Sequence, residues 1–381
     1  MKKSLLSLSL ATFMMANDSF DQSQYVPDIS LTVDTSYVYR DKKTTGEEHA
    51  HEHEDHAHAA FNANDGFNLN YAELVLSSNV DPYFSLDGVF HFTEEGVEIE
   101  EAYFTTTALE YSLRLRGGKM LSNFGRLNTE HHHVWDFADN SLVNEAFLGN
   151  EGLSDMGLQL QWVAPTETYL MGGIEVLQGS EHASFKNSAI EDANISATTA
   201  PSLYIGYIKT SFDVGDSIFY GGLSYAYGAN NLEHFREDEA LSFSGYSTLY
   251  GIDLTIKHYF DSYSYLSLQS EWILKNLNGE SLENRQKKSV DENEAGYYAQ
   301  LVYAYNQNYR FGFRGDSLYD EANTQNRYSL MSEYNPSEFA RLRLQYNYKD
   351  SELDNEGHEQ NQHSVILQLN IAIGAHSAHA F

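Results

Sequence analysis

The sequence predicts an all-β fold: a transmembrane outer-membrane β-barrel of about 16 antiparallel strands, with short periplasmic turns and long extracellular loops. Three observations predict it. Apolar and polar residues alternate over long segments, as they do in strands with one apolar and one polar face. The connections between these segments are alternately short and long. No window of 18 apolar residues follows the N-terminal region, so only strands could cross a membrane.

Composition narrows the class of protein further. Of the 381 residues, 55 are acidic and 23 are basic, for a formal net charge of −32. Nucleic acid is therefore not an expected partner, because phosphate binding needs a basic face. Cysteine is absent, which excludes disulfides, thiolate metal sites and thiol catalysis. The 28 tyrosines and 21 phenylalanines, against 5 prolines, favour strands over disordered segments.

The N-terminal residues, MKKSLLSLSLATFMMAND, carry two lysines followed by an apolar stretch from Leu5 to Ala16. This pattern is typical of a secretory signal peptide, which we place at residues 1–16 with cleavage after Ala16. Residues 17–27 would then form a short periplasmic segment, and residues 28–381 a single barrel. Export combined with spanning strands predicts the outer membrane of a Gram-negative bacterium, with its lipid and lipopolysaccharide as surroundings.

Sixteen alternating segments can be counted in order along the chain. They begin near residues 28, 67, 83, 98, 109, 154, 168, 202, 217, 246, 263, 295, 309, 326, 339 and 363, and the fourth and seventh are the noisiest. Short turns are expected at SNVDP, APTET, DVGD, NQN and NPSE, and long loops near 41–66, 121–153, 179–200, 229–245, 276–294 and 350–362. A soluble β-sandwich would also alternate, but the signal peptide, the missing cysteines and the two classes of connection favour the barrel. The final Phe381 fits a signal for the barrel assembly machinery.

The extracellular loop at 41–66 contains the segment EEHAHEHEDHAHAAF. Its histidines are His49, His51, His53, His56 and His58. Neutral imidazole is a good ligand for Zn²⁺, Cu²⁺ and Ni²⁺, and the neighbouring carboxylates add oxygen ligands. We interpret this segment as a collector that captures a divalent transition metal, zinc above all, weakly and at several positions. The alternative is a solvated, low-complexity loop without a ligand.

A second histidine cluster lies in the longest loop, at 121–153, which we expect to fold into the lumen. It consists of His131, His132 and His133 with Glu130, Asp136 and Asp139. In an extended backbone His131 and His133 project to one side, as two ligands of one metal ion would. The alternative is that these residues only anchor the folded loop to the barrel wall by hydrogen bonds and packing.

Six arginines share the polar side of their strands. They are Arg114, Arg116, Arg310, Arg314, Arg341 and Arg343. Facing lipid would cost each of them a few kcal/mol, so we predict that they line the pore. They would form a basic strip that favours anions, or they would pair with lumen glutamates such as Glu100 and Glu110 as a structural ladder.

The loop SNFGRLNTEHHHVWDFADNSLVNEAFLGN resembles a family of Gram-negative proteins usually labelled zinc-regulated outer-membrane receptors, and more distantly the phosphate-selective porins. The matching positions are Gly125, Leu127, Asn128, His131, His133, Trp135, Asp136, Phe137, Leu148 and Gly149. The stretches IEEAYF, PSEFARLRLQYN and GAHSAHAF extend the resemblance over residues 28–381. The family often has a proline after WDFAD, where this chain has Asn140 and Ser141. The family name sometimes implies energy-coupled uptake through a plugged barrel of about 22 strands, but the few residues before the first strand leave no room for a plug.

An enzyme is not expected, because neither Gly-x-Ser-x-Gly nor His-Glu-x-x-His occurs. We expect a porin-like channel for the passage or capture of divalent transition metal ions, with zinc favoured, or of small metal complexes, and no required cofactor. Two alternatives stay open: a general or anion-preferring porin with incidental histidines, and a closed barrel that binds or adheres at the cell surface. A homotrimer is the expected assembly to test.

Overall fold

The structure is a computed structural model, which describes residues 26–42, 61–190, 195–233, 235, 241–283, 286–319, 324–353 and 359–374. Three predictions fall on residues outside these ranges. They are the signal peptide at 1–16, the histidines at 49, 51, 53, 56 and 58, and the terminal Phe381.

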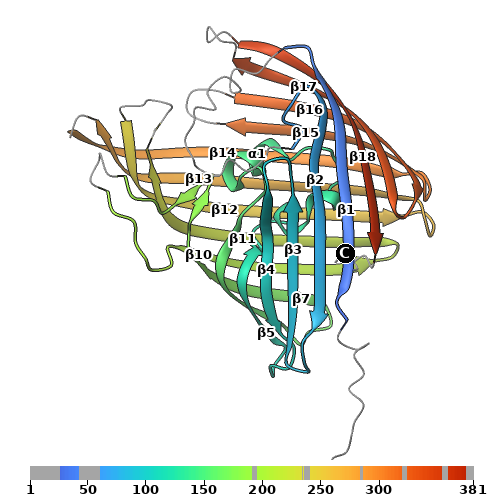
Figure 1. Cartoon of the computed structure of the whole chain (residues 1–381), viewed down its shortest axis with the longest axis horizontal. Coiled ribbons are helices and arrows are strands. Elements are labelled where there is room, and N and C mark those ends of the chain that lie inside the picture. Colours follow the sequence, from blue (N-terminus) through green and yellow to red (C-terminus); the bar gives the residue numbers. More distant parts are fainter. Residues whose placement is uncertain are drawn as a thin grey trace, which may run out of the picture.

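One antiparallel sheet closes on itself into a barrel of 16 strands (Figure 1). The barrel strands are β1 (Asp28–Arg40), β2 (Gly66–Asn79), β3 (Phe84–Phe92), β4 (Val97–Thr106), β5 (Leu113–Leu121), β6 (Ser154–Val163), β7 (Tyr169–Leu177), β10 (Leu203–Val214), β11 (Ser217–Leu232), β12 (Leu241–Tyr259), β13 (Tyr265–Glu283), β14 (Gln286–Ala304), β15 (Tyr309–Tyr319), β16 (Thr324–Ser337), β17 (Ala340–Leu353) and β18 (Glu359–Gly374). The short strands β8 (Glu181–His182) and β9 (Phe185–Lys186) lie in the loop between β7 and β10. Closure comes from β1, which pairs with both β2 and β18. The predicted fold class and strand number are confirmed.

The strands predicted to begin near 109, 246, 295 and 363 begin at Leu113, Leu241, Gln286 and Glu359. Two of these differences have distinct physical reasons. Residues 276–294 are not a loop, because β13 and β14 pair residue by residue up to Glu283 and Gln286. This hairpin extends past the end of β15, whose pairing with β14 begins only at Ala295 (Figure 1). Water on both sides of such an extension removes the alternation that marks a spanning strand. The fifth strand begins at Leu113 rather than near 109, because Tyr111 and Ser112 form a left-handed turn with φ of 61° and 57°.

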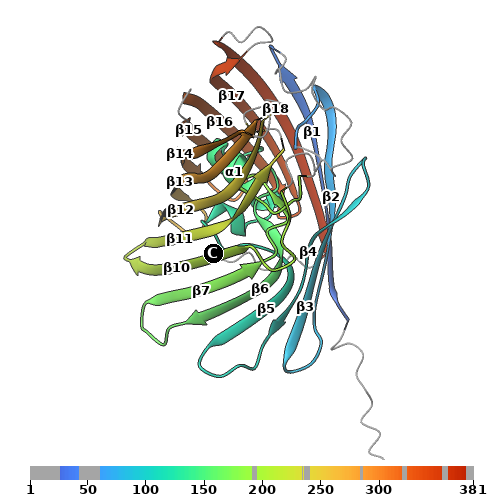
Figure 2. The same cartoon turned by 90° about the vertical axis from the view of Figure 1, so that its left-hand side faces the viewer.

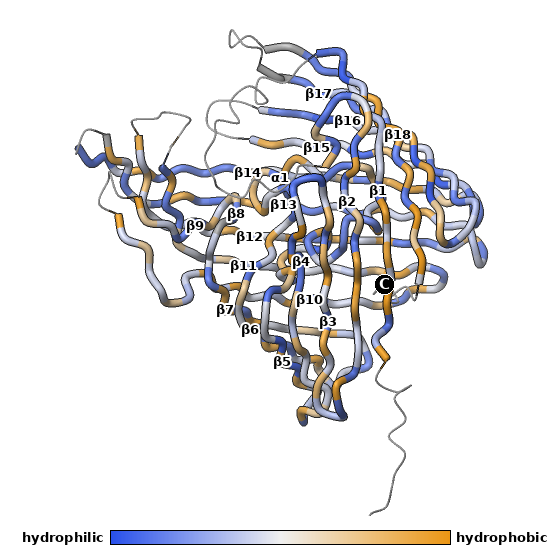
Figure 3. Tube along the Cα trace, viewed as in Figure 1, coloured by the Kyte–Doolittle hydropathy of each residue, from blue (hydrophilic) through white to orange (hydrophobic). Residues whose placement is uncertain are grey.

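The two faces of the barrel wall differ in polarity. On β1, Thr32, Asp34 and Ser36 are buried inside, whereas Tyr37 and Tyr39 are exposed outside. Figure 3 shows the same alternation of hydrophilic and hydrophobic residues along most strands. A closed barrel with an apolar outer band leaves no backbone group unpaired in hydrocarbon, and this is the architecture of outer-membrane proteins of Gram-negative bacteria, to which the chain belongs by fold. None of the helices in the described part of the chain has the length and apolar character that a membrane crossing needs.

Residues 122–153, here called the inner loop, fold into the lumen. They contain two short 3₁₀ helices, Leu127–Thr129 and His132–Val134, and the helix α1 (Leu142–Leu148). The helix lies between the barrel walls in both views (Figures 1 and 2) and contacts β13, β14 and β15. Its apolar residues Val143 and Phe147, with Phe124 and Leu127, form a buried core inside the barrel. These residues correspond to the loop expected at 121–153.

Two β-bulges interrupt the wall that faces the inner loop. In β2, Asp34 pairs with Tyr71 and the next residue with Leu69, so Asn70 is an extra residue. In β4, Val89 pairs with Glu101 and the next residue with Ile99, so Glu100 is an extra residue. A bulge turns two successive side chains to the same face. As a result Glu100 and Glu101 both point into the lumen, although they are neighbours in the sequence.

Candidate metal-binding site in the lumen

Six side chains, here called the histidine cluster, meet where the inner loop touches β2, β3 and β4. They are Glu73 of β2, His91 of β3, Glu100 and Glu101 of β4, and His131 and His133 of the inner loop. Glu73 and His91 are opposite each other in the β2–β3 ladder. The bulge adds the two adjacent carboxylates of β4, and the loop brings its histidines from the other side. Four segments of sequence are therefore needed to build one cluster.

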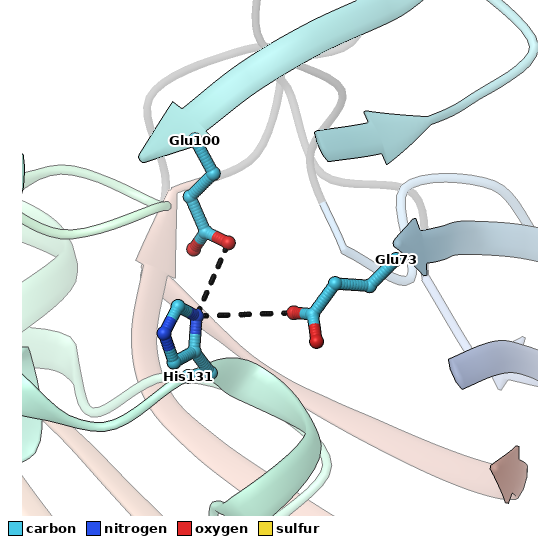
Figure 4. A group of neighbouring side chains, drawn as sticks. All are labelled: Glu73, Glu100 and His131. Carbon is cyan, nitrogen blue, oxygen red and sulfur yellow. Dashed lines mark hydrogen bonds and ion pairs between the residues drawn. The ribbon is translucent and has the colours of Figure 1, made fainter. Parts of the chain in front are cut away.

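Three of these side chains, Glu73, Glu100 and His131, have ligand atoms that all lie within 4.8 Å of one another. His131 Nδ1 lies 3.2 Å from Glu100 Oε2 and 3.8 Å from Glu73 Oε2 (Figure 4). His91 lies outside this group of three, but its Nε2 is 2.9 Å from the same oxygen of Glu100 and 3.2 Å from that of Glu73. Ligands of a tetrahedral zinc ion are about 3.4 Å apart, because each metal–ligand bond is about 2.0–2.2 Å long. The distances from His131 to the two carboxylates are close to that spacing.

The remaining two members, His133 and Glu101, each contact one residue of that group. His133 Nδ1 lies 3.0 Å from Glu73 Oε1, the second oxygen of that carboxylate. His131 Nε2 lies 3.2 Å from Glu101 Oε2. A histidine that ligates a metal through one ring nitrogen commonly donates its other N–H to a carboxylate, which fixes the ring and raises its basicity. Glu101 occupies that position behind His131.

The three consecutive histidines of the inner loop differ in environment. Burial alone would lower the pKa of His131, but the opposing effect of Glu100 and Glu101 is larger and raises that pKa well above its usual value. Burial lowers the pKa of His132 to about 3, so this ring is neutral. His132 packs between Phe61 and Trp135, with ring centroids 3.8 Å and 4.3 Å away. His132 is thus a packing residue, whereas His131 is held by carboxylates.

The end of the first extracellular loop reaches this same region. Phe61 contacts His132 and Trp135, and Asn62 donates to the carbonyl of Ala138 in the inner loop at 2.8 Å. The backbone N–H of Asn62 also donates to the side-chain oxygen of Asn70, the extra residue of the β2 bulge, at 2.9 Å. The chain that follows the predicted collector segment is therefore anchored directly on the inner loop.

The opposite side of the inner loop is held by a second group, here called the arginine anchor. It consists of Arg310, Arg314, Arg327, Arg341 and Arg343 with Asp136, Asp139, Asp316 and Glu333. Arg314 bonds Asp139 at 2.7 Å and Asp316 at 2.9 Å, and Arg343 bonds Glu333 at 2.8 Å. Arg341 donates to the backbone carbonyl of His133 at 2.6 Å.

The six arginines that were predicted to line the pore lie in different environments in the structure. A cavity of about 1520 Å³ adjoins the inner loop, and Arg116, Arg310 and Arg341 are in its wall. Arg314 and Arg343 are only 2% and 0% exposed under the inner loop, which corrects the expectation for these two. Arg114 is exposed and is not in the cavity wall. The carboxylates that pair with the buried arginines come from the anchor, not from Glu100 or Glu110.

Arg116 differs from the other cationic residues of the cavity. Its guanidinium lies 5.0 Å from the ring centroid of Tyr103, and no carboxylate of the described residues pairs with it. Its buried Nε has no hydrogen-bond partner in the described part of the chain. Arg126, by comparison, is paired with Glu130 at 2.8 Å.

Sequence reasoning proposed His131 and His133 but missed four residues: Glu73, His91, Glu101 and Arg327. Glu73 and His91 each stand alone as an ionisable residue within an apolar strand, in YAELVL and GVFHF. Such residues in spanning segments mark functional positions, so this signal was present. Glu101 was hidden because the bulge breaks the alternation on which the assignment of faces relied.

Comparisons with known proteins bear on the fold and the family. No family model matches the chain. An uncharacterized protein of Aquifex aeolicus (strain VF5) is 39% identical over 383 residues, which cover 95% of this chain and 81% of that protein. The chain also resembles the anion-selective porin from Comamonas acidovorans (TM-score 0.59, 10% identity, 91% of this chain and 99% of that chain). The outer membrane channel DcaP of Acinetobacter baumannii is similar (TM-score 0.56, 11% identity, 91% and 98% covered), as is OmpT of Vibrio cholerae (TM-score 0.57, 10% identity, 91% and 97% covered). At such identities these structures show a shared porin-type barrel.

Proposed function

The chain belongs to one family with the uncharacterized Aquifex aeolicus protein, and we propose that its porin-type barrel is an outer-membrane channel whose lumen captures divalent transition metal ions, with zinc favoured. The observation that carries this proposal is the convergence of Glu73, Glu100 and His131, whose ligand atoms all lie within 4.8 Å of one another. His91 contacts the same two carboxylates from outside this group of three.

The donor set argues for a transition metal rather than for calcium or magnesium. One imidazole with two carboxylates fits zinc, whereas calcium and magnesium prefer oxygen ligands alone. Glu101 behind His131 supplies the carboxylate–histidine pair that such sites use to orient the ring. Glu73, His91 and Glu100 are 1–4% exposed, so an ion held there would be shielded from bulk water and retained.

The histidine-rich segment around His49–His58 has a separate part in the proposal. Its imidazoles would concentrate ions outside the barrel, and the residues that follow it contact the inner loop beside His132. A free imidazole has a pKa of about 6.5, so we expect metal capture by this segment to weaken below about pH 6.

Calorimetry of the purified, folded protein tests the proposal. We expect Glu100→Gln and His131→Ala to lower zinc affinity by about 10- to 100-fold, as loss of a ligand or of its carboxylate support does. His258→Ala, which changes a histidine of β12 outside the cluster, is the matched control and should bind as the wild type does. A variant with His49, His51, His53, His56 and His58 changed to Ala separates the loop from the lumen. Wild-type affinity in Glu100→Gln would contradict the proposal.

A second candidate function is an anion-preferring porin, and the unpaired guanidinium of Arg116 favours it. Charges act more strongly inside a narrow pore than in bulk water. Arg116→Glu should therefore move the reversal potential, measured across a salt gradient in planar bilayers, towards cation preference. An unchanged reversal potential with an intact barrel would show that Arg116 does not face the current path.

A further inference from the structure

The cavity beside the histidine cluster combines two kinds of recognition group. Glu101, His131 and His133 form one part of its wall, and Arg116, Arg126, Arg310 and Arg341 form others. The same wall carries carboxylates, among them Glu130, Asp136 and Glu333. A solute that binds an arginine left without such a carboxylate partner must itself carry negative charge.

Only one of these four arginines lacks a carboxylate among the described residues. Arg126 pairs with Glu130, Arg310 with Asp136 and Glu333, and Arg341 lies 3.9 Å from Glu333. Arg116 has the face of Tyr103 beside it, and its buried Nε–H, like that of the other three arginines, has no acceptor within the described ranges. A buried donor without an acceptor is costly, and a planar guanidinium fits a carboxylate with two parallel hydrogen bonds.

Arg116 shares the cavity wall with Tyr103, Glu101 and His131. His131 Nε2 lies 3.2 Å from Glu101. Glu101 and Tyr103 are two residues apart on the same face of β4, which separates their side chains by about 7 Å. Arg116 follows at 5.0 Å from the Tyr103 ring. The wall of the cavity thus runs from a guanidinium without a carboxylate partner among the described residues to the imidazole of His131.

We infer that the metal reaches the histidine cluster as an anionic complex with a small polycarboxylate, which Arg116 binds through a carboxylate while the ion exchanges onto His131 and its neighbouring glutamates. This inference rests on the proposed function and adds the chemical form of the solute. The step is a ligand exchange without redox change: the ion leaves carboxylate oxygens of the chelator and gains imidazole nitrogen and protein carboxylate ligands. The cavity of about 1520 Å³ far exceeds the needs of a bare ion.

Liposomes that contain the full-length protein and a zinc-sensitive dye test the inference with three probes: zinc chloride, citrate alone, and zinc with citrate in excess. In the wild type, zinc–citrate should enter about tenfold faster than zinc chloride, because a charge-assisted hydrogen bond is worth about that factor. Arg116→Gln should remove the difference, and Arg116→Lys should restore part of it. Arg114→Gln is the matched control, since it removes the same charge from the same strand outside the cavity wall.

The outcomes distinguish this inference from the proposed function. Equal entry of zinc chloride and zinc–citrate, with Arg116→Gln unchanged and zinc still bound in calorimetry, overturns the inference and leaves the metal site intact. Block of ionic current by citrate alone, as strong as by zinc–citrate, overturns it too, because the cavity would then select carboxylates without the metal. Absence of zinc binding in the wild type overturns the proposed function and the inference with it.

Discussion

The inner loop is held on its two sides by different chemistry. On the side of β15–β17, the arginine anchor joins it through guanidinium–carboxylate pairs, among them Arg314 with Asp139 at 2.7 Å. On the side of β2–β4, the histidine cluster joins it through imidazoles, such as His131 with Glu100 at 3.2 Å. Arginine keeps its charge at every pH that a protein meets, whereas histidine changes its charge near neutrality and also ligates metals. One side therefore fixes the loop by permanent charges, and the other side holds it by groups whose charge depends on pH.

The largest expected effect concerns the arginine anchor. Asp139→Ala would leave Arg314 and Arg327 with fewer partners in a buried site, and should lower the free energy of unfolding by about 3–5 kcal/mol. Nearby Arg327 and Arg314 outweigh the effect of burial and lower the pKa of Asp139 to about 2. Its stabilising contribution is present above about pH 4 and is lost only as the pH falls towards 2, so the loss should be the same at pH 6 and pH 9. Denaturant unfolding followed by tryptophan fluorescence measures it.

The control for this prediction is Glu95→Ala, an exposed change in the turn between β3 and β4 that should shift the free energy of unfolding little. A loss in Asp139→Ala that disappears between pH 6 and pH 9 would contradict the view of the arginine anchor as a pH-independent contact.

An intermediate effect on stability is expected from zinc at the histidine cluster. At a free concentration of about 100 times its dissociation constant, zinc should raise the free energy of unfolding by about 2.7 kcal/mol. Because the pKa of His131 is raised by its carboxylate neighbours, a proton must leave before the ring can ligate, and zinc affinity should keep increasing with pH above the usual histidine value of about 6.5. Asp139→Ala should retain this response and Glu100→Gln should lose it. Stabilisation by zinc that is equal at pH 5 and pH 8 would show that no imidazole takes part.

The smallest expected effect separates the two sides in metal-free protein. With a chelator present, His131→Ala should cost about 1.5 kcal/mol at pH 6, the value of a hydrogen bond to a charged group. The folded-state pKa of His131 lies above its unfolded value, so this contribution is complete below about pH 6.5 and is lost as the pH rises through the raised value. The cost should therefore shrink at high pH, while that of Asp139→Ala does not. Equal costs of His131→Ala at pH 6 and pH 10 would contradict the assignment.

The sequence predicted the barrel well because lipid and lumen impose opposite polarity on the two faces of every spanning strand. The prediction failed where strands extend beyond the membrane, because the two faces no longer differ in polarity there. The hairpin of β13 and β14 continues beyond the membrane through residues 276–294, and there alternation gives no signal. We predicted that His131 and His133 project to one side of an extended backbone, whereas residues 132–134 form a 3₁₀ helix. The two rings lie stacked, 5.9 Å apart at 14°. Glu73 and His91, which complete the cluster, come from strands far away in the sequence, and only the closed barrel brings them there. That the cluster binds a metal stays a prediction.

The extra residue in β4 has a consequence for how such proteins change over evolutionary time. Glu100 is accommodated locally, because the pairing of β4 with β3 continues on both sides of it. The insertion of a single codon into a spanning strand is thus enough to place two neighbouring side chains inside a barrel while the remaining strands keep their registration. Barrel walls, and not only their loops, can therefore acquire new binding chemistry by insertion or deletion of one amino acid.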